Sequence, residues 1–169
     1  MRLRFEAVLR VIVAATALSL ATAAHAAGPL AVTGGSPVAV GEYLVAIGGC
    51  NDCHTEGWNK APGAIPPAQR LAGVAIGWHG PWGTSYAINL RLLMQRLSVE
   101  QWLGYVETMQ PKPPMPWFNM RAMSETDLKA MYAYIRSLGP AGVATPADLP
   151  PGQKPTTPYI EALPQPPKP

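Results

Sequence analysis

Proline and glycine divide this chain into segments and confine regular structure to a few short stretches. Residues 55–90 contain six Gly and four Pro, and no part of them keeps a helical or strand period. Residues 140–169 contain ten of the chain's 20 Pro and also lack apolar periodicity. A long irregular segment inside a compact domain is expected only where it has a function, such as wrapping around something that is not protein.

Three of the remaining stretches have the start signals and the apolar spacing of short helices. One follows Ser36-Pro37 and leads to Cys50. A second, over 99–109, opens with a capping box of Ser98 and Gln101. A third begins at Ser124 and has a core-facing stripe of Leu128, Met131, Tyr132, Ile135 and Leu138. We therefore expect an all-α domain over 36–139, with three or four short helices, long loops and no convincing strand.

Both ends of the chain lie outside that expected domain. Residues 1–26 have basic residues first, then an apolar run from Val11, then the small-residue cleavage pattern Ala24-His25-Ala26. The alternative, a membrane anchor, is disfavoured because a transmembrane helix needs about 20 apolar residues. We therefore expect a cleaved signal peptide, a periplasmic protein and no membrane span in the mature chain. Residues 27–35 are expected to be a flexible lead, and 140–169 an extended or disordered tail.

Export also changes the apparent charge. The full chain carries a formal +3, and loss of Arg2, Arg4, Arg10 and Glu6 leaves about +1. A nearly neutral chain of this size gives no support to binding of nucleic acid or anionic lipid.

One motif indicates a chemical function, namely Cys50-Asn51-Asp52-Cys53-His54. It is the CxxCH pattern of c-type haem attachment. Residues three apart lie on one face of a helical turn, so both thiols can reach the vinyl groups of a single haem. His54 can then ligate the iron. The haem would supply the core that so small a helical domain otherwise lacks.

Three other roles for this cysteine pair are less consistent with the sequence. A thioredoxin-like redox pair requires a βαβ context, which the chain lacks. A zinc site needs four ligands, and Cys50, Cys53, His54 and His79 are the only set available. A plain disulfide would leave His54 and the long loop unexplained.

With its other motifs included, the chain resembles class I monohaem cytochromes c. The matching residues are Gly41-Glu42-Tyr43-Leu44, the motif 50–54, Met115-Pro116 and the closing stretch 132–138. The last two features also resemble cytochrome domains that accompany bacterial dehydrogenases. The resemblance covers about 36–139 and implies a cytochrome c fold around one covalently bound haem c. It also implies a contact between the first and last helices, at Gly41 and Tyr134.

For the second axial iron ligand, the resemblance points to Met115. Prolines on both sides stiffen its segment and can hold the thioether in place. Met120, Met123, His79 or an open position remain alternatives. Met94, Met109 and Met131 are expected to pack in the core.

The same resemblance suggests that Trp82, Tyr86 and Asn89 line the haem and meet its propionates. The alternative is that the two aromatic residues are ordinary loop residues. Arg91 is expected either to pair with a propionate or to be solvated.

These residues predict a one-electron carrier rather than an enzyme. Its partners would be redox proteins, such as a dehydrogenase, an oxidase or a larger cytochrome. A haem-based ligand sensor or gas-binding protein is an alternative if the sixth ligand is weak. A second alternative is an electron-relay subunit of a dehydrogenase complex, tethered by its tail. A peroxidase is disfavoured because no distal His/Arg pair is evident.

Overall fold

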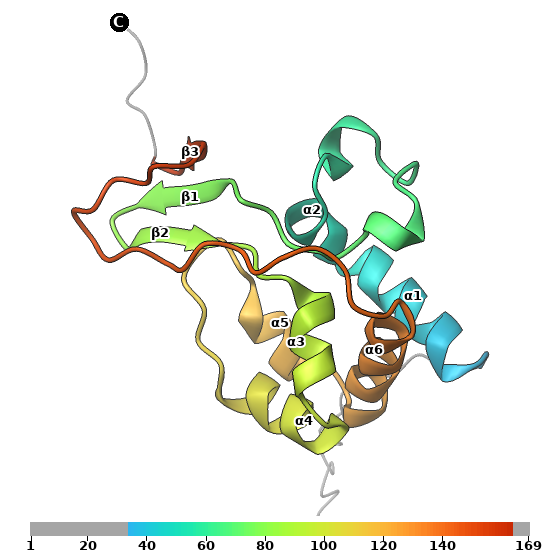
Figure 1. Cartoon of the computed structure of the whole chain (residues 1–169). Coiled ribbons are helices and arrows are strands. Elements are labelled where there is room, and N and C mark those ends of the chain that lie inside the picture. The colour runs from blue at the N-terminus through green and yellow to red at the C-terminus, as the bar shows by residue number, and fades with distance from the viewer. Residues whose placement is uncertain (1–33, 164–169) are drawn as a thin grey trace, which may run out of the picture.

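The computed structural model describes residues 34–163, which fold as short helices around a central cavity, with a small sheet at one side (Figure 1). The helices are α1 (Pro37–Ile47), α2 (Cys50–His54), α3 (Leu90–Arg96), α4 (Val99–Thr108), α5 (Trp117–Ala122) and α6 (Glu125–Ser137). Two 3-10 turns cover Trp58–Lys60 and Pro67–Gln69, and the strands are β1 (Gly77–Gly80), β2 (Gly83–Tyr86) and β3 (Tyr159–Glu161). The mainly helical fold is confirmed, although the described residues contain six α-helices rather than three or four.

The three helices that carry start signals begin where those signals stand. Ser36 accepts a hydrogen bond from the amide of Ala39 at the start of α1. Ser98 and Gln101 form the reciprocal capping box of α4. Ser124 caps α6, which buries Met131 and Ile135 in the core. The missed helices α3 and α5 have seven and six residues, too few for a clear apolar period.

Helices α1 and α6 cross with almost no space between them. A Cβ atom built on Gly41 would overlap the carbonyl oxygen of Ala130 and lie 2.7 Å from Cβ of Tyr134. Tyr134 is buried at this crossing. The expected contact between Gly41 and Tyr134 is therefore present, and the missing side chain of Gly41 is what allows it.

The expectation of no strand was wrong. Strands β1 and β2 form an antiparallel hairpin, and β3 pairs with β1 in parallel, giving the order β2-β1-β3. Both hairpin strands begin with glycine and have four residues each, so their sequence shows no alternation. Strand β3 comes from the far end of the chain, and a non-local pairing of this kind leaves no local signal.

The C-terminal segment 140–163 is extended, but it packs against the domain. Figure 1 shows it, in orange to red, running from α6 past α3 and along β2 before it reaches β1. Leu149 forms an isolated bridge with Thr84 of β2. Residues 140–163 are therefore ordered in the structure. Backbone pairing holds them in place, although their sequence has no apolar period.

The expected signal peptide 1–26 and most of the expected lead 27–35 lie outside the described residues. Between residues 34 and 163, no helix has both the length and the apolar character needed to cross a membrane.

Candidate functional site

A cavity of about 1150 Å³ lies at the centre of the helices. This is large for a small-molecule site, which usually measures about 300–1,000 Å³. Its lining includes Cys50, Cys53, His54 and Met115. Residues of α3, of α4 and of the C-terminal segment complete the wall. The structure thus brings the motif and the Met115 segment, far apart in sequence, to one space.

The two cysteines stand on the short helix α2, which begins after Gly49 in the left-handed conformation (φ 67°). Both are partly buried and not joined by a disulfide. Burial raises the pKa of the Cys50 thiol to about 11 and also raises the pKa of Cys53. Redox and nucleophilic cysteines have lowered pKa values, so this environment does not suit a thioredoxin-like pair.

His54 is buried and held from two directions. Its Nδ1 lies 2.7 Å from the carbonyl oxygen of Ile88, and its own carbonyl oxygen accepts a hydrogen bond from the amide of Gly73. The Ile88 contact leaves Nε2 as the ring nitrogen available to a ligand. Burial lowers the pKa of His54, and the Ile88 carbonyl offsets this only in part. The imidazole is therefore neutral at pH 7, as a metal ligand must be.

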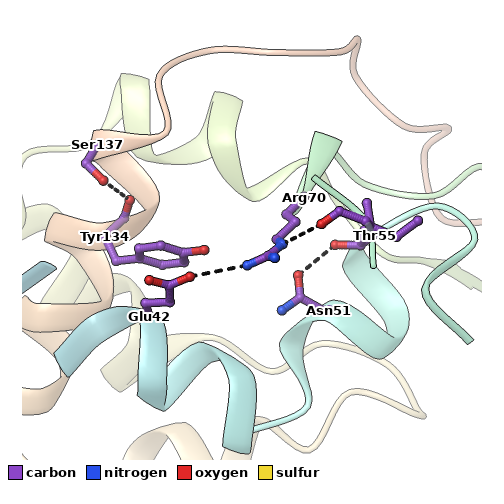
Figure 2. Close-up of polar contacts among 7 residues, drawn as sticks. Glu42, Asn51, Thr55, Arg70, Tyr134 and Ser137 are labelled. Carbon is purple, nitrogen blue, oxygen red and sulfur yellow. Dashed lines mark hydrogen bonds and ion pairs between the residues drawn. The ribbon is translucent and has the colours of Figure 1, made fainter. Parts of the chain in front are cut away.

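Polar contacts fasten the long loop around the motif helix (Figure 2). Thr55 Oγ1 donates to Asn51 Oδ1 at 2.8 Å and accepts the amide hydrogen of Leu71 at 2.8 Å. Arg70 lies 3.3 Å from Glu42 of α1 and donates to the carbonyl oxygen of Ile65. The loop is irregular because it wraps around the motif, and these contacts fix its path.

Met115 lies in the irregular segment between α4 and α5, directly after a turn at Pro113–Pro114, and it lines the cavity. Met120 and Met123 line the same cavity, so both remain near the motif. Met94 and Met131 are fully buried in the core, as the sequence predicts, and Met109 packs against it. Met109 and Met131 also reach the cavity wall.

Two of the three predicted surrounding residues line the cavity. Asn89 lies in the wall, but its amide donates to the carbonyl oxygens of Ala141 and Val143. Neither of its N–H groups is thus left for a carboxylate. Tyr86 also lines the cavity, and its hydroxyl lies 2.8 Å from Thr157 Oγ1.

Trp82 and His79 are not brought to the cavity. Trp82 occupies the turn between β1 and β2, where its Nε1 is buried without a partner. His79 lies on β1, with Nδ1 2.8 Å from Thr84 Oγ1. Neither belongs to the cavity lining. Within residues 34–163, no group of three His, Cys, Asp or Glu side chains could hold a metal ion, so the zinc alternative has no support.

Arg91 is buried rather than solvated, and it does not belong to the cavity lining. Only 3% of it is exposed, and its guanidinium donates to the backbone carbonyls of Ala68, Leu138 and Gly139. Arg91 thus ties α3 to the end of α6 and to the long loop. The hydrogen-bonding partners are backbone groups, and no side-chain pattern could have revealed them.

Several polar or aromatic residues of the cavity wall were not singled out from the sequence, among them Trp78, Ser85, Lys112 and Asp148. Asp148 had a weak signal, because it is the single acidic residue between Pro140 and Ile160. Trp78, Ser85 and Lys112 lie in segments without apolar periodicity, so the sequence does not show which side chains face the interior.

The donor set matches a covalently attached haem. Two cysteines three residues apart, a neutral histidine with one free ring nitrogen and a thioether all line one large cavity. The family model for cytochrome c matches residues 38–139. Comparison with curated proteins and with solved structures found no match.

Proposed function

The chain belongs to the cytochrome c family, which implies a haem-based electron carrier. From this premise, we propose that it is a periplasmic one-electron carrier with a single haem c. Cys50 and Cys53 would form the thioether bonds, and His54 and Met115 would be the axial iron ligands. The observation that carries the proposal is the common cavity, because Cys50, Cys53, His54 and Met115 all line it.

When bound, the haem supplies reversible Fe(III)/Fe(II) cycling, and the chain's own residues hold and tune it. The thioether bonds would use both thiols of α2. The carbonyl of Ile88 orients the His54 ring and fixes its tautomer, as a hydrogen bond to the other ring nitrogen usually does for a histidine ligand. The thioether of Met115 would favour the reduced iron and raise the potential.

A filled sixth position distinguishes a carrier from a ligand sensor. Met115, Met120 and Met123 line the cavity in addition to the core residues Met109 and Met131, and this favours thioether ligation over an open position. The sensor and gas-binding alternative would require that none of them holds the iron firmly.

The periplasmic location rests on the signal peptide expected at residues 1–26, and N-terminal sequencing of exported protein tests it. The redox partner would be a dehydrogenase, an oxidase or a larger cytochrome. The chain could serve one of these as a free carrier or as a bound relay subunit.

The function is tested on protein purified from the periplasmic fraction. A haem stain that survives denaturing electrophoresis, a reversible one-electron redox titration and a ferrous form that does not bind carbon monoxide at neutral pH are the expected results. Rapid carbon monoxide binding by the wild type would favour the sensor instead. Absence of covalent haem, or iron that cannot be cycled reversibly, would overturn the proposal.

A further inference from the structure

The C-terminal segment 140–163 lies beyond the residues that match the family, yet it forms part of the cavity wall. We propose that this segment is a latch that positions the Met115 segment, residues 110–116, with Lys112 and Asp148 as positioning residues. The inference rests on the proposed function, because it concerns how the sixth ligand is held.

The latch is itself fixed to the β1–β2 hairpin. Leu149 and Thr84 exchange two backbone hydrogen bonds, of 3.1 and 2.9 Å. Gly83 (φ 95°) permits this approach, because a Cβ atom there would overlap the carbonyl oxygen of Leu149. The amide of Tyr86 donates to Asp148 Oδ1 at 3.1 Å. The segment is therefore attached by backbone geometry and by a side chain at adjacent residues.

The Met115 segment depends on side-chain contacts for its placement. Among the described residues, Gln110 to Pro114 make no backbone–backbone hydrogen bond. Lys112 Nζ donates to the carbonyl oxygen of Leu149 at 2.8 Å, and Ser85 Oγ donates to that of Pro113 at 2.5 Å. The prolines make this segment stiff, so fixing Lys112 and Pro113 also fixes the position of Met115.

The two polar contacts of the Lys112 ammonium group differ in strength. Its Nζ lies 3.9 Å from Asp148 Oδ2, and both side chains are partly exposed, so the ion pair is screened by solvent. The hydrogen bond to the Leu149 carbonyl is charge-assisted and shorter. Lys112 is thus the main connection, and Asp148 supports it by holding Leu149 in place through the amide of Tyr86.

Loosening this latch would release Met115 from the iron without affecting haem attachment. The Cys50 and Cys53 thioethers lie on α2, and the contacts of Lys112 and Asp148 involve neither α2 nor the His54 ring. The separation gives a readout that general loss of structure would not produce: covalent haem is retained while the Met–iron signature is lost.

The test uses full-length Lys112→Leu and Asp148→Ala proteins; leucine is chosen because a methionine at position 112 would add a thioether to the cavity wall. The weak far-red Met–iron absorption band and carbon monoxide binding by the ferrous form are measured at neutral pH. We expect Lys112→Leu to lose most of the band and to bind carbon monoxide readily, as we also expect of Met115→Leu. Asp148→Ala should show a smaller change in the same direction, and Lys112→Arg, which keeps a charged donor, should restore the wild-type spectrum.

Lys129→Leu is the matched control, because it removes an exposed lysine whose partner is Glu125 on α6, 2.7 Å away. Wild-type spectra for both Lys112→Leu and Asp148→Ala would overturn the latch, as would a Met115→Leu protein that keeps the band. A wild-type protein without covalent haem would instead overturn the proposed function. If Lys112→Leu fails to mature, Asp148→Ala decides, because it keeps the contact of Lys112 to the backbone; a partly weakened band supports the latch, and a wild-type spectrum overturns it.

Discussion

At the scale of single residues, the sixth ligand is the assignment with the most alternatives. Met115, Met120 and Met123 all line the cavity. Met115 alone lies between two prolines in a segment outside the helices, while Met120 lies within α5 and Met123 directly follows it. The backbone at Met115 is therefore stiffened by the two prolines and is not part of a helix, so this segment places the side chain.

Substitution of each methionine by leucine separates the three while keeping the volume of the side chain. Met115→Leu should keep the covalent haem, lose the far-red band and lower the reduction potential, because the thioether favours the reduced iron. Met120→Leu and Met123→Leu should keep the band. Visible spectra and a redox titration check this, and loss of the band in either of the last two would move the ligand there.

The buried histidine gives a pH dependence with a defined sign. Because the pKa of His54 is lowered in the folded chain, the unfolded chain binds its proton more readily. The free energy of unfolding should therefore fall as the pH drops below the ordinary value of 6.5, by at most about 1.4 kcal/mol per pH unit from this one proton. Binding of the ring to iron acts in the same direction, since a protonated imidazole cannot be a ligand.

Urea unfolding curves between pH 7.5 and 5.5 measure this dependence. The same curves are measured for the His79→Gln protein, which replaces the other histidine of the described chain. Stability independent of pH in both proteins would contradict the buried, neutral state of His54.

The motif shows why some residues could be predicted and others could not. The spacing of Cys50, Cys53 and His54 is itself a chemical signal, so it could be read without a structure. The function of Arg91 depends on three backbone carbonyls from distant segments, which carry no side-chain pattern. The hydrogen bonds of Asn89 to Ala141 and Val143 could not be predicted either, because their acceptors are also backbone carbonyls of a distant segment.

At the scale of elements, the crossing of α1 and α6 sets how the motif helix meets the core. Gly41→Ala places a methyl group on the Ala130 carbonyl, so the helices must separate. We expect a loss of about 3 kcal/mol or more in the free energy of unfolding, at the upper end for overpacking. Reduced yield of the haem protein would accompany it.

Gly104→Ala in α4 is the matched control for that substitution. A Cβ atom at Gly104 meets nothing within 4 Å, and the residue lies inside a helix. Here alanine should stabilise the protein by about 0.5–1 kcal/mol, because glycine is the more flexible residue in the unfolded chain. Equal effects of the two substitutions in thermal unfolding would contradict the close crossing.

Helices could be predicted from the sequence where a capping residue or an apolar stripe marks them. Ser98 with Gln101 marks the start of α4, and the apolar stripe marks α6, because capping and periodicity are properties of neighbouring residues. Helix α3 has an equally good cap in Asn89, which accepts the amide hydrogen of Leu92. It was missed because its seven residues are too few for a clear apolar period, and β3 was missed because its partner is far away in sequence.

At the scale of the whole molecule, the cavity makes folding depend on what fills it. The wall includes core residues such as Leu44, Trp102 and Ile135, so an empty cavity would remove packing partners from several helices at once. Cys53→Ala or His54→Ala should therefore prevent maturation and leave a chain that is unfolded or rapidly degraded.

Circular dichroism and limited proteolysis of the Cys53→Ala chain check this dependence. A chain with native helix content and protease resistance in the absence of haem would contradict it. Ser137→Ala, which removes a hydroxyl bonded to the Tyr134 carbonyl away from the cavity, provides a variant that should mature normally (Figure 2).

The position of the C-terminal segment shows the limit of the sequence at this scale. Its prolines do predict an extended chain, and the chain is extended. Its attachment to Thr84, Tyr86 and Lys112 consists of hydrogen bonds to the backbone and to one carboxylate, which composition cannot reveal. The segment therefore belongs to the cavity wall even though it looks like a tail.

The central claim is that one haem is bound covalently through Cys50 and Cys53. The most direct test is the mass of the exported protein under denaturing conditions, followed by mapping of the peptide that contains residues 50–54. The account predicts the chain without residues 1–26, heavier by one haem, with all of the added mass on that peptide. A peptide that carries two free thiols or a Cys50–Cys53 disulfide, and no haem, would contradict it.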